Sequence, residues 1–259
     1  MTFVPNPPTG YETFLFVTAK SYPRVRPDIA VYMIGPAKAP PVIVMHELGG
    51  LSPSCLELAD ELANPGDGGK AFRVYLPLFF GRPASTKKIS IKGLWCMRRE
   101  MHYLASNKTS PITNLLRELV ADVADKSTAE KAGVIGMCLT GNLVFGLMAE
   151  ARTGAVVSSQ PSLPWSMGMP ALKKAALGAS DRDLVEAVAS GTPVMALRFE
   201  EDLFCPAERL NTVGDIFGPA GSPPPDTVDG RGHSVLTANR DDAVPDRVPV
   251  VREFLRQNL

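Results

Sequence analysis

Short apolar runs and amphipathic helical patterns alternate along most of this 259-residue chain. This alternation is typical of βαβ units, in which helices cover both faces of a largely parallel sheet. The predicted strands are Phe14–Val17, Ile29–Ile34, Pro41–Met45, Ala71–Leu76, Gly133–Ile135, Ala155–Ser159 and Pro193–Phe199. The predicted helices are Ser54–Ala63, Ile112–Ala124, Asn142–Ala151, Asp181–Ala189, Cys205–Val213 and Val248–Gln257. An α/β fold is therefore expected.

Three segments depart from this rhythm. The first two strands flank a Pro-rich connection, Tyr22 to Pro27, and suit an antiparallel hairpin at a sheet edge. The segment 214–232 is too rich in Pro and Gly for regular structure. The segment 83–111 is basic, with Trp95 and Tyr103 interleaved, and is either a lid or a solvated insertion. We expect one domain over residues 1–259 that carries this insertion.

The stretch from Ala132 to Ala149 carries no charge and is nearly long enough to span a membrane. Its four glycines, with Thr140 and Asn142, divide it instead into a strand, a tight turn and a helix. A strand that is buried on both faces of a parallel sheet also reads as continuous apolar sequence. We therefore predict no membrane span here.

The amino-acid composition excludes several classes of protein for this chain. With 45% apolar and 21% charged residues, the chain has enough material for a core, which excludes disorder and small disulfide scaffolds. Lys plus Arg equals Asp plus Glu at 27 each, so no charge excess indicates nucleic acid or a membrane surface as partner. Four cysteines without a CxxC pair and three histidines predict no zinc site. The N-terminus shows no secretion signal, and a cytoplasmic protein with reduced thiols and a small-molecule partner is expected.

The turn at residues 136–141, Gly-Met-Cys-Leu-Thr-Gly, has the pattern of a nucleophile elbow with Cys138 in place of Ser. A residue at such a strand-to-helix turn protrudes, and the helix N-terminus favours thiolate over thiol. The backbone N–H of Leu139 is then free to bind an oxyanion. The alternative is that Cys138 is a small core residue.

The order of later residues supports the elbow. After an elbow nucleophile, this kind of fold needs an acid beyond a later strand and then a histidine. Glu200, Glu201 and Asp202 follow one predicted strand, and His233 comes later. We favour Asp202 because it lies further into the loop, where the carboxyl edge of a sheet opens. His233 would serve as the base.

Two other loops are expected at the same edge. Residues 46–50, His-Glu-Leu-Gly-Gly, follow the strand Pro41–Met45, and the Leu48 N–H is a second candidate oxyanion donor. Because position 50 is glycine, this is not an HExxH metal motif. Arg82, after the strand Ala71–Leu76, could clamp a substrate carboxylate or simply face solvent.

Together these motifs, from about Tyr11 to the C-terminus, resemble the dienelactone hydrolase (carboxymethylenebutenolidase) family of the α/β-hydrolase superfamily. The resemblance implies an α/β-hydrolase fold with Cys138 as nucleophile, His233 as base and Asp202 as the orienting acid. It also implies that Glu47 pairs with the resting cysteine and that Arg82 is one of two arginines that hold a substrate carboxylate. The second arginine is absent, because Thr237 occupies its position. Arg231 and Arg240 are nearby candidates to replace it.

The sequence thus predicts a hydrolase that opens a lactone or cleaves an ester through a thioester on Cys138, without metal or organic cofactor. Acyl transfer, or cleavage of a C–halogen or C–C bond, would use the same fold and nucleophile. A non-catalytic thiol-sensing or binding protein is a third reading. The sequence leaves open the natural substrate, whether it bears a carboxylate, and the choice between monomer and small homo-oligomer.

Overall fold

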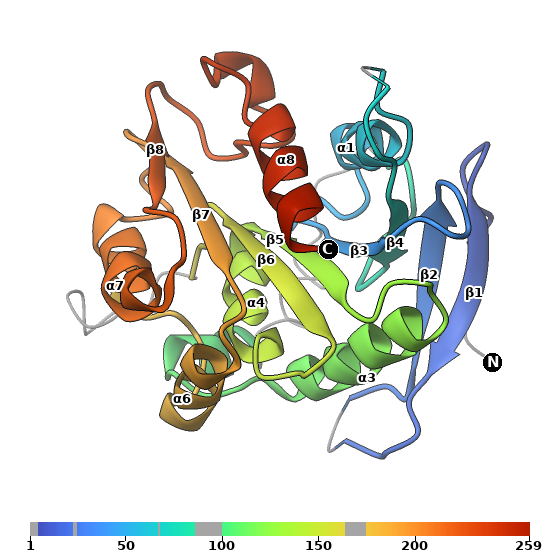
Figure 1. Ribbon diagram of the computed structural model, residues 1–259, viewed down its shortest axis with the longest axis horizontal. Coiled ribbons are helices and arrows are strands. Elements are labelled where there is room, and N and C mark those ends of the chain that lie inside the picture. Colours follow the sequence, from blue (N-terminus) through green and yellow to red (C-terminus); the bar gives the residue numbers. More distant parts are fainter. Residues whose placement is uncertain (1–4, 23–24, 67, 86–99, 164–174) are drawn as a thin grey trace.

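The computed structural model describes residues 5–22, 25–66, 68–85, 100–163 and 175–259. Within them, eight strands form one sheet in the order β1-β2-β4-β3-β5-β6-β7-β8 (Figure 1). Strand β2 pairs antiparallel with β1 and β4, and the remaining neighbours are parallel. The strands are β1 Glu12–Val17, β2 Asp28–Ile34, β3 Pro41–Met45, β4 Arg73–Pro77, β5 Ala132–Met137, β6 Thr153–Ser159, β7 Val194–Phe199 and β8 Asp226–Val228. The predicted edge hairpin and parallel sheet are confirmed.

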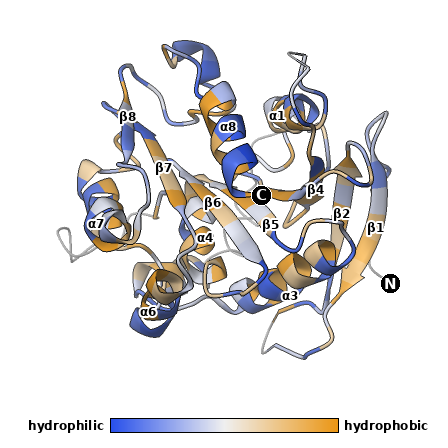
Figure 2. Cartoon of the chain, viewed as in Figure 1, coloured by the Kyte–Doolittle hydropathy of each residue, from blue (hydrophilic) through white to orange (hydrophobic). Residues whose placement is uncertain are grey.

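Helices cover both faces of the sheet. Helices α1 (Pro53–Ala63) and α8 (Val248–Asn258) pack on one face and share a core with it. The other face carries α3 (Pro111–Asp125), α4 (Leu143–Leu147), α6 (Asp181–Ser190) and α7 (Ala207–Phe217). Figure 2 shows apolar central strands and helices whose polar sides face away from them. Short 3₁₀ turns are η1 Cys138–Asn142, η2 Gly218–Ala220 and η3 Arg240–Asp242.

Successive residues of the central strands enter the two cores in turn. Val134 of β5 packs with the α3 side and Ile135 with the α8 side, and Val156 and Val157 of β6 repeat the pattern. All four side chains are buried, as the period of two in a strand requires when both faces are covered. This double burial explains why the strands read as uninterrupted apolar runs.

The uncharged stretch between Ala132 and Ala149 forms β5, η1 and α4, in agreement with the strand, turn and helix prediction. The helix is shorter than predicted, since α4 ends at Leu147. Among the described residues, no helix has the length and apolar character that a membrane crossing would need.

The prediction that residues 214–232 lack regular structure is wrong. Helix α7 continues to Phe217, η2 follows, and β8 pairs in parallel with β7. Strand β8 has only three residues and no apolar period of its own. It forms because β7 supplies its hydrogen-bond partners. Of the basic segment 83–111, residues 86–99 lie outside the described part, and residues 100–105 are helical.

The strand order creates the place for a site. From β3 the chain moves to β4 on one side, and it then crosses back to β5 on the other side of β3. The carboxyl ends of β3 and β5 therefore flank a topological switch point, where open α/β sheets bind ligands. The loops that follow β3, β5, β6, β7 and β8 carry the residues described next.

Candidate active site

Cys138 stands at the turn between β5 and η1, with its backbone in the left-handed region at a φ of +59°. A non-glycine residue rarely adopts this conformation, and such strain is characteristic of nucleophile elbows. Gly136 and Gly141, on either side of Cys138, leave no room for a side chain. A Cβ on Gly136 would lie 2.4 Å from the carbonyl oxygen of Thr140, and one on Gly141 would lie 3.0 Å from that of Ser159.

Thr140 stands where the serine elbow motif has its last glycine. Its hydroxyl accepts a hydrogen bond from the Met137 N–H at 2.9 Å and can donate its proton to the carbonyl of Met137 at 2.9 Å or to that of Met45 at 3.0 Å. Because Met45 is the last residue of β3, the Thr140 side chain brings the end of β3 into contact with the elbow. Nothing in the elbow motif itself predicts this role for Thr140.

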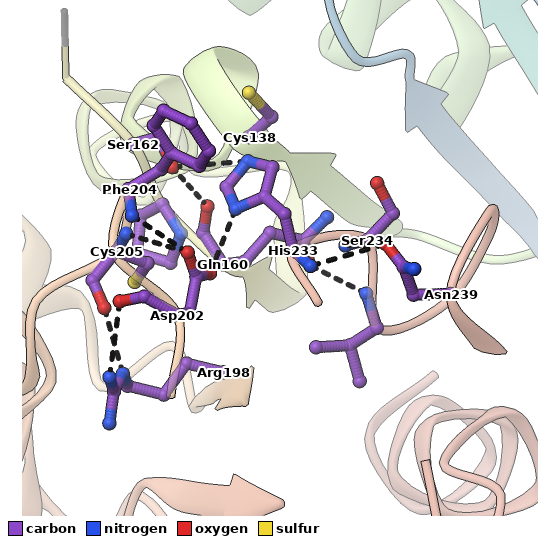
Figure 3. A network of polar contacts seen from close by, with 12 residues as sticks. Cys138, Gln160, Ser162, Arg198, Asp202, Phe204, Cys205, His233, Ser234 and Asn239 are labelled. Atoms are coloured by element: carbon purple, nitrogen blue, oxygen red, sulfur yellow. Dashed lines mark hydrogen bonds and ion pairs between the residues drawn. The ribbon is translucent and has the colours of Figure 1, made fainter. Parts of the chain in front are cut away.

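Asp202 and His233 form a hydrogen-bonded pair, with 2.8 Å between Asp202 Oδ2 and His233 Nδ1 (Figure 3). The Asp202 side chain is fully buried. Its other oxygen accepts hydrogen bonds from the backbone N–H groups of Phe204 at 2.8 Å and Cys205 at 3.1 Å. Of the three acidic residues after β7, Glu200 and Glu201 are exposed. Asp202 is therefore the acid that the fold orients toward the histidine.

Arg198, on β7, donates hydrogen bonds to the backbone of the loop that carries Asp202. It is 5% exposed, and its guanidinium donates to the carbonyls of Cys205 and Glu200, each at 2.8 Å. A planar guanidinium suits this task because its several donors point in fixed directions. Sequence reasoning missed Arg198, since it lies inside an apolar strand pattern.

Cys138 lies beside the His233 ring, on the side of Nε2, the nitrogen that does not face Asp202 (Figure 3). Burial alone lowers the pKa of His233, but hydrogen bonds with Asp202 and Cys138 and their negative charge outweigh it and raise this pKa to about 10. The Phe204 ring packs edge-on against the imidazole, with 5.4 Å between ring centroids. The arrangement favours a protonated imidazole between a carboxylate and a sulfur.

Glu47 is held differently from the pairing with Cys138 that the resemblance implies. Its carboxylate accepts hydrogen bonds from Gln160 Nε2 at 2.7 Å, Ser234 Oγ at 2.9 Å and Thr237 Oγ1 at 3.0 Å. No hydrogen bond joins it to Cys138 within the described residues. Thr237, at the position of the missing arginine, thus supplies a neutral donor where a cation was expected.

Three arginines that the sequence singled out differ in their partners in the structure. Arg240 is bound to Glu61 and Asp246, and hydrogen bonds to these two carboxylates raise its pKa further above its ordinary value. Arg231 is exposed and pairs with Glu201 at 2.7 Å. Both arginines therefore already have carboxylate partners within the chain. Arg82 is exposed and makes no ion pair with any described residue.

The two candidate oxyanion donors belong to the loops that Thr140 joins. Leu139 follows Cys138 at the start of η1, where the first N–H groups lack helical partners. Leu48 lies in a turn that the Gly50 N–H closes on the Glu47 carbonyl at 2.9 Å, with Gly50 at a φ of +76°. No described group accepts a hydrogen bond from either leucine N–H.

His46 is fully buried between the rings of Phe79 and Phe80. Its Nδ1–H donates to the Glu47 carbonyl at 2.7 Å, and its Nε2 accepts from the Phe79 N–H at 3.1 Å. Burial lowers its pKa to about 4. A neutral His46 therefore links the loops after β3 and β4. Among the described residues, no three His, Cys, Asp or Glu side chains gather as a metal site would require.

Comparisons with known proteins agree with the architecture. The family model of the dienelactone hydrolases matches residues 29–221, while no curated protein matches the chain. A candidate dienelactone hydrolase from Klebsiella pneumoniae is 16% identical and aligns over 95% of this chain and 99% of its own, with a TM-score of 0.61. An esterase from Pyrococcus furiosus is 13% identical over 98% and 97% of the two chains, with a TM-score of 0.60. A dienelactone hydrolase-like promiscuous phosphotriesterase from metagenomic libraries is 15% identical over 96% and 99%, with a TM-score of 0.60. These structures confirm the α/β-hydrolase fold.

Proposed function

Because this chain belongs to the dienelactone hydrolase family, and is thus a hydrolase that acts on ester bonds, we propose that it cleaves a lactone or ester through a thioester on Cys138. The observation that carries the proposal is the strained backbone of Cys138 at the elbow, beside a His233 that Asp202 holds at 2.8 Å. Strained backbone at non-glycine residues clusters at active sites, which supports a chemical role for Cys138.

The reaction begins with attack of the Cys138 thiolate on the substrate carbonyl. The tetrahedral oxyanion is stabilised by the N–H groups of Leu139 and Leu48. As the C–O bond breaks, His233 gives its Nε2 proton to the leaving oxygen, and the acyl group stays on sulfur as a thioester. His233 then takes a proton from water, whose oxygen attacks the thioester, and the acid leaves as the thiolate and the imidazolium form again. Asp202 keeps the imidazole oriented throughout.

Ester and lactone substrates suit this site better than amides. Sulfur is a good leaving group, so the tetrahedral intermediate returns to thiolate unless the other leaving group is also good. Arg82 would bind a carboxylate on the substrate, without the second arginine that other members carry. We therefore propose a small ester or lactone whose carboxylate, where present, contributes to binding through Arg82 alone.

Replacing Cys138 tests the nucleophile. The Cys138→Ala variant should lose hydrolysis of p-nitrophenyl acetate, and intact-mass spectrometry after rapid mixing should find the acyl adduct on the wild type only. Cys55→Ala is the matched control, because Cys55 is a buried thiol of α1 whose pKa burial raises. Full activity in Cys138→Ala would overturn the proposal. An adduct without turnover would point to acyl transfer or thiol sensing instead.

Replacing Arg82 tests the substrate preference. Arg82→Ala should reduce kcat/KM for carboxylate-bearing lactones by roughly tenfold, the value of one exposed charge-assisted contact, and leave neutral esters unaffected. Equal losses on both kinds of substrate would refute the carboxylate contact.

A further inference from the structure

Ser162, in the loop after β6, contacts the same imidazole as Asp202 and Cys138. Its Oγ lies 3.3 Å from His233 Nε2, the ring nitrogen that does not face Asp202 (Figure 3). Ser162 is 7% exposed, so solvent does not compete freely for this contact. The nitrogen that Ser162 touches is the one that moves protons in the proposed reaction.

The backbone of Ser162 is fixed to the elbow. Its N–H donates to the Cys138 carbonyl at 3.0 Å, and its own carbonyl accepts from Asn142 Nδ2 at 2.8 Å. The residue two positions earlier, Gln160, has a φ of +35°, a strained value for a residue with a side chain. Gln160 is also anchored, since its N–H donates to the Leu197 carbonyl at 2.6 Å. Ser162 is therefore held in one place, and only its hydroxyl can turn.

The hydrogen bonds of the Ser162 hydroxyl determine where its proton lies. The oxygen is 3.0 Å from the Gln160 carbonyl, which can only accept, so the hydroxyl donates its one proton there. Toward His233 the oxygen then offers a lone pair, which an Nε2–H would complement. With Nδ1 donating to Asp202, an imidazole protonated on both nitrogens satisfies both contacts.

We propose that Ser162 is a positioning residue that accepts the Nε2–H of His233 and so preserves the thiolate–imidazolium pair before substrate binds. This inference rests on the proposed function, which assigns the thiolate to Cys138. When His233 gives its Nε2 proton to the leaving oxygen, the Ser162 hydroxyl rotates from the Gln160 carbonyl toward the bare nitrogen. It returns when His233 takes a proton from water. No covalent bond of Ser162 changes.

The groups that face His233 agree with this role. Cys138 approaches from the elbow and Asp202 from the loop after β7, while the Phe204 ring from that loop is uncharged. Glu47 reaches the next residue, Ser234, and Glu201 is paired with Arg231 at the surface. The raised pKa of His233 is consistent with an imidazole surrounded by acceptors.

The Ser162→Ala variant tests the proposal through pH dependence. Without the acceptor, the acidic limb of kcat/KM for p-nitrophenyl acetate, and the Cys138 pKa from pH-dependent iodoacetamide alkylation, should both rise by about one unit. KM should stay unchanged, and Ser162→Thr, which keeps the hydroxyl, should restore the wild-type limb. Ser158→Ala is the matched control, because Ser158 is a buried serine whose hydroxyl donates to the Gly141 carbonyl at 2.9 Å and does not touch His233.

An unchanged acidic limb in a folded Ser162→Ala variant would overturn the proposal, as would an equal shift in Ser158→Ala. Nitrogen NMR of the wild-type His233 ring gives a check that needs no variant. Both ring nitrogens should carry protons at neutral pH, and an unprotonated Nε2 would refute the assignment. These outcomes are separate from those of Cys138→Ala, which decide the nucleophile whether or not Ser162 matters.

Discussion

Two histidines lie at the same edge of the sheet, and their surroundings give them opposite charge states. His46 follows β3 and is packed between two phenylalanine rings, and burial lowers its pKa to about 4. His233 follows β8, and although burial also lowers its pKa, its bonds with Asp202 and Cys138 raise it to about 10. The difference shows that the partners of a buried imidazole, more than its burial, decide whether it carries charge.

The contrast extends to what each histidine does. His46 joins two loops through one donated and one accepted hydrogen bond, which a neutral ring satisfies completely. His233 has two donors and faces acceptors on both sides. We therefore expect His46 to contribute to stability and His233 to contribute to chemistry.

The largest effect should follow from His233→Asn. Asparagine retains a polar side chain but cannot take and return a proton, so kcat/KM for p-nitrophenyl acetate should fall by about 10³–10⁴-fold. Because the raised pKa of His233 means that its charged form also stabilises the fold near neutral pH, the midpoint of urea unfolding should fall as well. A loss below tenfold would mean that another group serves as the base and would end the contrast between the two histidines.

A smaller effect, on stability, should follow from His46→Ala. Removing a fully buried ring and leaving the Phe79 N–H without its acceptor should lower the free energy of unfolding by about 2–4 kcal/mol. Urea unfolding followed by fluorescence measures the loss. The folded fraction should retain most of its kcat, because His46 does not touch the reacting groups. If kcat fell as far as in His233→Asn, His46 would belong to the chemistry as well.

The pH dependence of stability sharpens the comparison further. His46 has a depressed pKa, so its contribution is present above its unfolded value near 6.5 and is lost as pH falls toward about 4. His233 has a raised pKa, so its contribution is present below pH 6.5 and is lost as pH rises toward about 10. For His46, the free energy of unfolding lost between about pH 6.5 and pH 4 is at most about 3 kcal/mol.

Urea unfolding measured from pH 4 to pH 10 tests both the loss of the His46 contribution in acid and the loss of the His233 contribution in alkali. Subtracting the His46→Ala curve from that of the wild type should leave a slope only on the acid side, and subtracting His233→Asn should leave one only on the alkaline side. A slope on the same side in both differences would show that the two imidazoles share one charge state.

Most of the architecture could be predicted from local pattern. The strand at Pro41–Met45 and the helix that begins at Asp181 match to the residue, because strong apolar periods and capping residues are local signals. Strand β8 could not be predicted, since a three-residue strand has no period and forms only against β7. That residues 83–111 form an insertion or a lid stays a prediction.

The site divides in the same way. Cys138, Asp202 and His233 follow from motif and chain order, and the structure brings them together. Ser162 and Arg198 have no motif, because each acts on a residue far along the chain through the geometry of the sheet edge. The hydrogen bonds of Glu47 likewise join the loops after β3, β6 and β8.

The sequence by itself determined the layers of the fold, the turn that carries Cys138, and the order of acid and base behind it. These properties depend on residue spacing along the chain, which the backbone converts directly into strands, helices and turns. Only the tertiary structure decided that Thr237 binds Glu47 in place of an arginine, that His46 is neutral and His233 charged, and that Ser162 faces the base. A hydrogen bond and a pKa depend on the atoms that surround a group, and those atoms come from strands that meet only when the sheet forms.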